Sequence, residues 1–186
     1  MQIIIQQTER MTKLIDNLLK FSRPQKVRHA KLEMAEVMEG VLSLLETQLE
    51  KTGVNVDFSV SPDLPQVEAD YYQLQQVFLN LILNSIQAMP EGGRLGLDIK
   101  PLNHDAVRIT VSDTGGGIPQ EHLSRVFEPF FSTKDSGQGT GLGLAIVSKI
   151  IRDHGGNIEA HSTPGEGATF SITMPVTQRK PEEKSA

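Results

Sequence analysis

The chain has 186 residues, of which 38% are hydrophobic and 22% are charged, with a net charge of -5 and no cysteine. This size and composition predict a soluble globular protein with a sizeable apolar core, while the acidic balance speaks against general nucleic-acid binding. The lack of cysteine excludes disulfides and thiolate metal sites and makes the cytoplasm the simplest compartment. No signal peptide is visible at the N-terminus, and attachment of a longer parent protein to a membrane is left open.

The first 22 residues are predicted to form a helix with a short heptad pattern. Ile4, Met11 and Leu18 recur every seven residues, as in a coiled coil. Pro24 ends the pattern, and a polar, basic stretch follows. A charged, proline-containing segment closes the chain and is predicted to be disordered. The sequence therefore divides into a helical segment 1–24, a linker 25–31, a main domain 32–176 and a disordered tail 177–186.

The main domain is predicted to intermix helices and strands. Apolar periodicity predicts helices over residues 34–51, 71–89, 119–126 and 142–154. Alternating apolar residues predict strands over residues 54–60, 94–100, 107–112, 157–162 and 168–175. This order indicates an α/β (α+β) two-layer sandwich, in which a mixed, mainly antiparallel sheet is covered on one face by helices, with the N-terminal helix appended.

The predicted helix 71–89 contains no charged residue and carries a stripe of side-chain amides. The amides are Gln73, Gln76, Asn80, Asn84 and Gln87. A membrane span is a remote alternative, because these amides would be costly in lipid. The stripe is either an unusual solvated face or a polar lining for a ligand, since asparagine is a poor helix former. An amide oxygen can also complete the shell of a Mg²⁺ ion.

Two glycine-rich segments are the next candidates. In residues 113–117 an aspartate at a strand end is followed by three glycines, which fits close approach of a flat ring or another backbone, or an ordinary Asp-Gly turn. In residues 137–144 alternate glycines open a helix, which predicts an anion site suited to phosphate. The second segment is neither a P-loop nor a dinucleotide-binding fingerprint, because no Gly-Lys-Ser/Thr follows it and no strand directly precedes it.

Between these segments, residues 127–134 combine aromatic rings with a short polar run. The rings favour a hinge that packs on the domain, and Lys134 is placed to reach a terminal phosphate or is merely solvated. Few aliphatic anchors lie in the loop. We therefore expect residues 132–139 to be mobile without nucleotide, with Phe127 and Phe130 packed.

Taken together and in this order, the four segments resemble the ATP-binding domain of sensor histidine kinases. That domain belongs to the superfamily that includes gyrase, the ninety-kilodalton heat-shock chaperone and the mismatch-repair ATPases. Its four boxes have likenesses here: residues 80–88 resemble the N box, 113–117 the first glycine box, 127–131 the F box and 139–144 the second glycine box. The short lid most resembles the nitrogen-regulation type of sensor kinase.

The resemblance implies ATP and Mg²⁺ as cofactors and gives roles to individual residues. Asn84 would hold the metal with Asn80 beside it, Asp113 would accept from the adenine amine, and Lys134 would act with both asparagines in catalysis. The other implied nucleotide contacts are Gly115, Gly117, Ile118, Phe127, Phe130, Thr133, Gly139, Thr140, Gly141, Leu142, Gly143 and Thr169. Relatives often carry a hydroxyl residue where this chain has Ala168. Asn80 stands where the hydrolysing relatives carry a glutamate, and an amide cannot act as a general base.

The resemblance also extends to partners. Residues 10–24 look like the end of the second helix of a dimerisation and histidine-phosphotransfer domain, truncated before the helix with the acceptor histidine. The implied partners are that acceptor helix of the parent kinase and a response regulator, with a weak homodimer through residues 1–22 and no nucleic acid. The five histidines are predicted to be surface or packing residues. The alternatives are an ATP-driven conformational ATPase and a nucleotide-binding adaptor.

Overall fold

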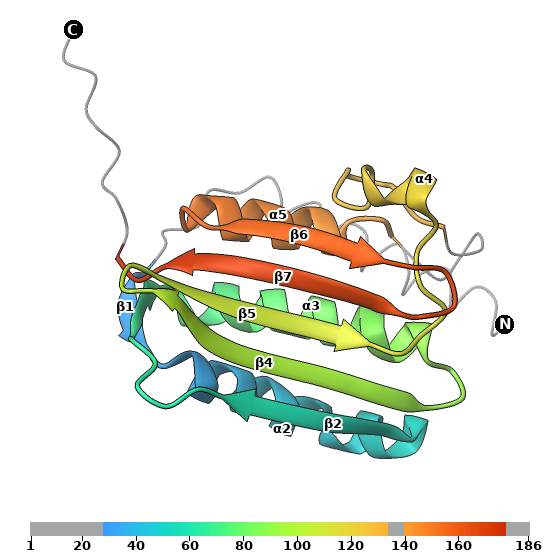
Figure 1. The fold of residues 1–186 in the computed structure, drawn as a ribbon, viewed down its shortest axis with the longest axis horizontal. Coiled ribbons are helices and arrows are strands. Elements are labelled where there is room, and N and C mark those ends of the chain that lie inside the picture. Colours follow the sequence, from blue (N-terminus) through green and yellow to red (C-terminus); the bar gives the residue numbers. More distant parts are fainter. Residues whose placement is uncertain (1–27, 134–139, 178–186) are drawn as a thin grey trace, which may run out of the picture.

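The computed structural model describes residues 28–133 and 140–177, which form two layers (Figure 1). The elements in chain order are β1 (Ala30–Leu32), α2 (Met34–Thr52), β2 (Val54–Val60), β3 (Val67–Ala69), α3 (Tyr71–Ala88), β4 (Gly93–Asn103), β5 (Ala106–Asp113), α4 (Gln120–Leu123), α5 (Gly143–Asp153), β6 (Asn157–Ser162) and β7 (Ala168–Pro175). The predictions for the N-terminal helix, residues 134–139 and the tail beyond 177 lie outside the described residues.

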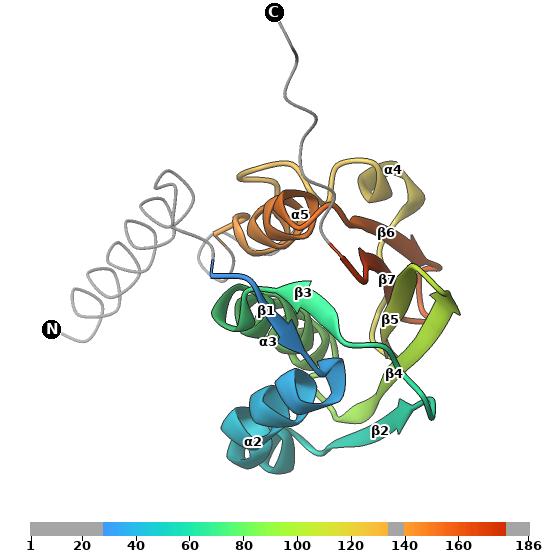
Figure 2. The same ribbon diagram turned by 90° about the vertical axis from the view of Figure 1, so that its left-hand side faces the viewer.

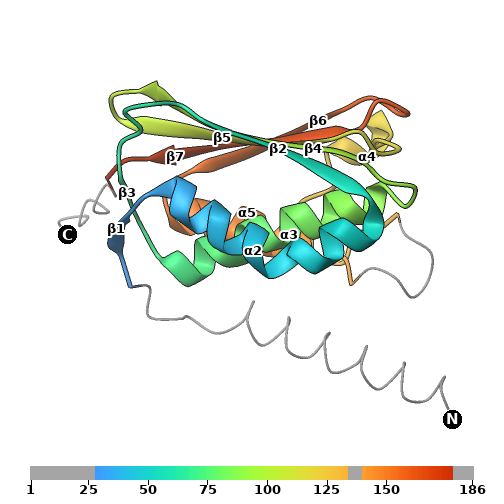
Figure 3. The same cartoon turned by 90° about the horizontal axis from the view of Figure 1, so that it is seen from below.

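The main sheet has five strands in the order β2-β4-β5-β7-β6. Strand β2 runs parallel to β4, and the other three pairs are antiparallel. The long helices α2, α3 and α5 lie together on one face of this sheet (Figure 3). The predicted two-layer sandwich, with a mixed, mainly antiparallel sheet covered on one face, is therefore confirmed.

The core lies between the sheet and the three long helices. In β7, buried and partly exposed residues alternate from Ala168 to Pro175, which is the period of a sheet with one covered face. Leu81 and Ile82 of α3 and Ile151 of α5 are fully buried against this face. Burial of each such side chain is worth about 1.5–3 kcal/mol. The same alternation decides which side chains of each strand can reach the candidate site.

The helix ends follow the capping signals in the sequence. Asp70 precedes α3, and its carboxylate accepts hydrogen bonds from the N–H groups of Tyr72 and Gln73 at 3.0 and 3.1 Å, which is the geometry of an N-cap. Gly53 ends α2 with a φ of 65°, in the left-handed conformation that glycine favours at a helix C-terminus. These two caps fix where α2 and α3 join the strands beside them.

Two short strands were missed by the sequence analysis. Strand β1 pairs with β3, with Ala30 opposite Ala69, and the N–H of Glu68 in β3 donates to Val176 at 2.9 Å. Figure 2 shows this pair beside α3. Ala30 and Lys31 were predicted to lie in a linker but belong to the domain. Three residues are too few to show an alternating pattern, so sequence periodicity could not reveal either strand.

Among the described residues, no helix is long and apolar enough to cross a membrane, and this includes the uncharged helix α3.

Candidate nucleotide site

The buried end of the site is Asp113, the last residue of β5, which is 7% exposed. Its Oδ2 accepts a hydrogen bond from Ser85 Oγ of α3 at 3.0 Å. Its Oδ1 accepts from the N–H groups of Gly115 at 3.0 Å and Ala168 at 3.3 Å. A carboxylate offers about four acceptor positions. These three bonds fix its orientation and leave capacity for one donor from a ligand.

The glycine loop after Asp113 is pressed against two neighbouring segments. A Cβ at Gly115 would lie 2.6 Å from the carbonyl oxygen of Ala88 in α3. Gly117 has a φ of 73°, and a Cβ there would overlap the backbone of Thr163. Only glycine fits at these two positions. The predicted close approach of backbones is therefore real, and it fixes the loop beside Asp113.

A second group of polar atoms lies where α3 meets the start of α5. A Cβ at Gly143 would contact Asn80 Oδ1 at 3.8 Å, and Asn84 follows Asn80 by one helical turn. Asn80 Nδ2 is buried and has no hydrogen-bond partner among the described residues. Helix α5 begins at Gly143 with no side-chain cap, so its positive end and orphan N–H groups suit an anion.

The two ends of the lid, near Phe127 and Gly141, are held to the domain by aromatic and backbone contacts. Phe127 packs edge-on against Phe170 of β7 with ring centroids 6.4 Å apart. The N–H of Phe130 donates to Gly141 at 2.9 Å, which brings the two ends of the lid together. Thr140 is linked to the glycine-rich segment by a hydrogen bond, because its Oγ1 accepts from the N–H of Leu142 at 3.3 Å.

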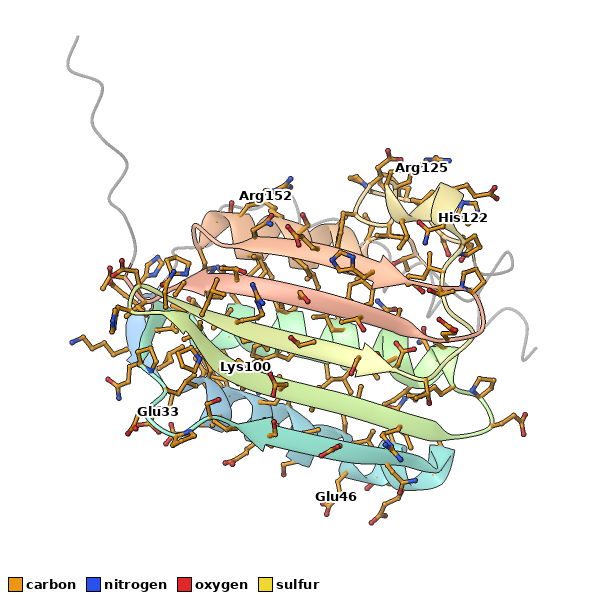
Figure 4. All side chains as sticks on the ribbon, in the orientation of Figure 1. Glu33, Glu46, Lys100, His122, Arg125 and Arg152 are labelled. Carbon is orange, nitrogen blue, oxygen red and sulfur yellow. The ribbon has the colours of Figure 1, made fainter. Side chains whose placement is uncertain are left out.

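The expectation that Phe130 packs is wrong, because this residue is 64% exposed. Phe130 has a φ of 66°, and Gly141 is so close that a Cβ there would lie 2.5 Å from the carbonyl carbon of Phe130. This turn directs the Phe130 ring away from the core. Phe131 packs instead, with Arg125 4.5 Å above its ring and His122 at 5.4 Å. Figure 4 shows Arg125 and His122 together on the α4 segment.

The start of β7 corrects the prediction for Thr169. Thr169 is opposite Ser112 of β5, and alternation puts both on the open face, away from Asp113. Ala168 occupies the site face. The hydroxyl on that face belongs to Ser162, whose Oγ accepts from the N–H of Ile118 at 2.7 Å and donates to Gly167 at 2.6 Å.

Sequence reasoning missed the residues that hold the site in place. Ser85 lies among the buried apolar residues of α3, and the N–H of Ala168 carries no side-chain signal. A serine within an otherwise apolar stripe is the one mark that could have revealed the Ser85–Asp113 bond. Thr133 is exposed at the end of the described lid, and Lys134 and Gly139 lie outside the described residues.

A polar cluster at the far end of the helices ties α3 to α5. His154 at the end of α5 is fully buried; its Nε2 accepts from the N–H of Asp70 at 3.0 Å, and its Nδ1 lies 2.8 Å from the Ile150 carbonyl. The proton therefore sits on Nδ1 and is donated to Ile150. Burial lowers the pKa of His154 below its ordinary value. Asp70 Oδ2 also accepts from the N–H of Arg28 at 2.8 Å.

The comparisons agree with this geometry. Residues 69–178 match the family of histidine kinase-, DNA gyrase B- and HSP90-like ATPases, and the chain belongs to this family. It is 34% identical over 183 residues to sporulation kinase E of Bacillus subtilis, 33% over 182 residues to the sensor histidine kinase ZraS of Klebsiella oxytoca, and 40% over 197 residues to the sensor kinase CckA of Brucella abortus. Each match covers 98% of this chain but only 24%, 39% and 20% of these relatives.

Solved structures give the same result. The catalytic domain of the histidine kinase ThkA superposes with a TM-score of 0.74 at 34% identity, over 81% of this chain and 97% of that one. Full-length ShkA in complex with AMPPNP superposes with a TM-score of 0.81 at 28% identity. This match covers 92% of this chain and 37% of the ShkA chain. The chain is thus homologous to the ATPase catalytic domain of sensor histidine kinases and has the nucleotide-binding fold of that family.

Proposed function

We propose that the chain binds ATP with Mg²⁺ and that its parent sensor kinase transfers the γ-phosphoryl group to a histidine on a separate helix. The observation that carries this proposal is the buried, unpartnered Nδ2 of Asn80 beside the uncapped start of α5. A buried donor without an acceptor is costly, and a helix N-terminus attracts phosphate. A bound triphosphate would satisfy both groups.

The two ends of the proposed site would receive different parts of the nucleotide. Asp113 would accept from the exocyclic amine of adenine, with Gly115, Gly117 and Ile118 beside the ring. Asn84 would supply an amide oxygen to Mg²⁺, which prefers oxygen ligands. The remaining phosphate contacts would come from Thr140, Leu142, Gly143 and the lid, including Thr133 and Lys134.

Transfer is favoured over hydrolysis by the chemistry of Asn80. Phosphoryl transfer requires positioning and charge neutralisation rather than covalent participation of the protein. Hydrolysis requires in addition a base for the attacking water, and an amide cannot serve as one. The names of the relatives, which include sensor histidine kinases, support the same choice.

The wider organisation follows from the proposed role. Residues 1–24 would be the second helix of a phosphotransfer domain, and the short lid would be of the nitrogen-regulation type. The partners would be the acceptor helix and a response regulator; a solved complex of ThkA with the response regulator protein TrrA is similar to this chain at 31% identity and a TM-score of 0.78. The parent would act in the cytoplasm or at its membrane boundary.

The test supplies labelled ATP and a separate polypeptide carrying the helix with the acceptor histidine. We expect acid-labile label on that polypeptide, and none on this chain, only when both are present with Mg²⁺. Asp113→Asn is the matched control and should abolish the transfer. Its amide oxygen can still accept the hydrogen bonds from Gly115 and Ala168, but the charge is lost. Label on this chain itself, or transfer unaffected by Asp113→Asn, would contradict the proposal.

A further inference from the structure

The sheet has one edge that nothing in the described chain covers. Strand β2 pairs with β4 on one side only and is the end of the strand order. At the opposite end, β6 is flanked by α4 (Figure 1). A free edge normally carries a device that prevents pairing, such as proline, a bulge or an inward charge. Over seven residues β2 has no proline and pairs with β4 in continuous register.

The backbone groups at this edge can be assigned from the register. Gly53 accepts from the N–H of Gly93, and the N–H of Ser61 donates to Ile99. Odd-numbered residues of β2 therefore direct their backbone groups toward β4. Because alternate residues of a strand point to opposite sides, Val54, Val56, Phe58 and Val60 direct their N–H and carbonyl groups outward.

Beside this edge lies a groove between β2 and α2, with a volume of about 490 Å³. Its apolar lining is Leu42, Leu49, Val54 and Val56. Val56 is 37% exposed and Val60 is 39% exposed, although both lie on the sheet face that the helices cover elsewhere. Side chains of an added strand would therefore meet an apolar surface continuous with the core.

The charge of the groove specifies the occupant. Glu46 and Glu50 of α2 line the groove, and no lining residue is basic. Figure 4 shows Glu46 at the margin of α2 beside the free edge of the sheet. A second copy of the chain would bring the same carboxylates to the interface, and like charges repel. A positively charged segment gains from the same carboxylates.

We propose that this groove binds an extended segment of another protein that joins the sheet as a sixth strand next to β2, with both apolar and basic residues on the face that looks into the groove. Main-chain hydrogen bonds to Val56 and Phe58 would provide the pairing, and the apolar and basic side chains of one face of the segment would enter the groove. Glu46 and Glu50 would select Lys or Arg. The surface is distinct from Asp113 and Asn80, so the proposal does not depend on the nucleotide site.

The test uses a fluorescent nine-residue peptide in which every second residue is in turn Val or Lys and the residues between them are Thr, so that one face carries both Val and Lys, and it measures anisotropy with the whole chain. We expect saturable binding that weakens about tenfold in Glu46→Lys/Glu50→Lys, since two attractive charge pairs become two repulsive ones. Glu121→Lys/Glu159→Lys makes the same change of net charge on α4 and β6 and should alter the affinity less than about twofold. Equal weakening in both double variants would reduce the binding to general charge attraction and overturn the proposal.

A second arm tests the backbone pairing. The same peptide with every second amide N-methylated keeps its side chains. It loses the N–H donors along the edge that faces β2, and we expect its binding to be lost. Val56→Pro removes an outward N–H without touching the bonds to β4. It should abolish peptide binding and leave ADP affinity unchanged. Full binding of the N-methylated peptide, or a dimer in light scattering that Val56→Pro dissociates, would overturn the proposal, the latter in favour of a second copy.

Discussion

At the scale of single residues, Asp113 shows how a charged group can be buried without strain. Three donors from three segments hold its carboxylate: Ser85 from α3, Gly115 from the loop and Ala168 from β7. Hydrogen bonds from these donors offset most of the free-energy cost of removing the carboxylate from water. The same bonds aim its remaining acceptor capacity in one direction, which is what recognition of an amine requires.

Replacement of Asp113 separates binding from folding. We expect Asp113→Asn to lower ADP affinity by roughly 1.5–3 kcal/mol, the worth of a hydrogen bond to a charged group, while the fold is kept. Asp113→Ala should lower the affinity at least as much and also destabilise the fold, because Ser85 Oγ and two N–H groups lose their acceptor. Titration calorimetry and urea unfolding of both variants measure the two effects. Unchanged ADP affinity in Asp113→Asn would remove the adenine assignment.

Asn80 allows a test of transfer against hydrolysis. We expect Asn80→Glu to raise slow ATP hydrolysis, because a positioned carboxylate base contributes about 10²–10⁴-fold. The gain should fall below that range, because nothing else at the junction of α3 and Gly143 is arranged for an attacking water. Phosphate release is the measurement, with Asn80→Gln as the uncharged control. Background hydrolysis in a folded Asn80→Glu variant that binds ATP would show that Asn80 alone does not withhold hydrolysis.

At the scale of elements, His154 and Asp70 join the ends of α3 and α5 that lie away from the candidate nucleotide site. The imidazole accepts from the Asp70 N–H and donates to Ile150, and the Asp70 carboxylate both caps α3 and binds the Arg28 N–H. Asn80 lies further along α3, and Gly143 lies at the other end of α5. Their relative position is therefore fixed by a polar contact at one end and by apolar packing between them.

The lowered pKa of His154 predicts a pH dependence of stability. Burial disfavours the charged ring in the folded state, so the unfolded state binds the proton more tightly. The stabilisation is fully present above the unfolded pKa of about 6.5 and is lost as the pH falls toward the folded value, by at most about 1.4 kcal/mol for each pH unit. Urea unfolding between pH 5 and 8 should show this slope, and His154→Gln should reduce it. An equal slope in the variant would assign the effect to other groups.

Asp70 variants distinguish capping from the contact with Arg28. Asparagine caps helices as well as aspartate does, but its amide nitrogen cannot accept a hydrogen bond. Asp70→Asn should therefore keep α3 capped and lose only the Arg28 contact, whereas Asp70→Ala should lose both and cost about 1 kcal/mol more. Thermal unfolding compares the two. Equal loss in both variants would mean that the cap contributes little in this domain.

The long elements could be predicted because local rules and tertiary packing agree in them. Val54–Val60, Asn157–Ser162 and Ala168–Pro175 begin and end as predicted, since Gly53, Gly156 and Gly167 mark their starts. The candidate site was predicted from its glycines and asparagines, and that assignment stays a prediction. What failed depends on facts outside local pattern: β1 and β3 are too short for periodicity, Phe130 is turned outward by Gly141, and Thr169 lies on the opposite face from Asp113. The β2 groove could not be predicted, because it arises from the edge of a sheet.

At the scale of the whole molecule, the described core accounts for a complete folding unit. The buried hydrophobic residues of the described chain run from Met34 to Met174, and the N–H of Arg28 donates a hydrogen bond to Asp70. All five strands of the main sheet and the three long helices lie between Arg28 and Thr177. Residues 1–22 would add a heptad seam of about three repeats, which is marginal for a coiled coil on its own.

A chain that begins at Arg28 and ends at Thr177 should therefore fold on its own. We expect one cooperative unfolding transition and an ADP affinity within about twofold of that of the full chain, because no proposed adenine contact lies outside this range. We also expect any dimer of the full chain to be weak and to be lost on this truncation, since the heptad seam would be removed. Calorimetry and light scattering over a range of concentrations measure both. A truncated chain that unfolds would show that residues 1–27 have a structural role. A tight dimer that survives truncation would place the interface elsewhere in the domain, and the free edge of β2 would then be the first surface to mutate.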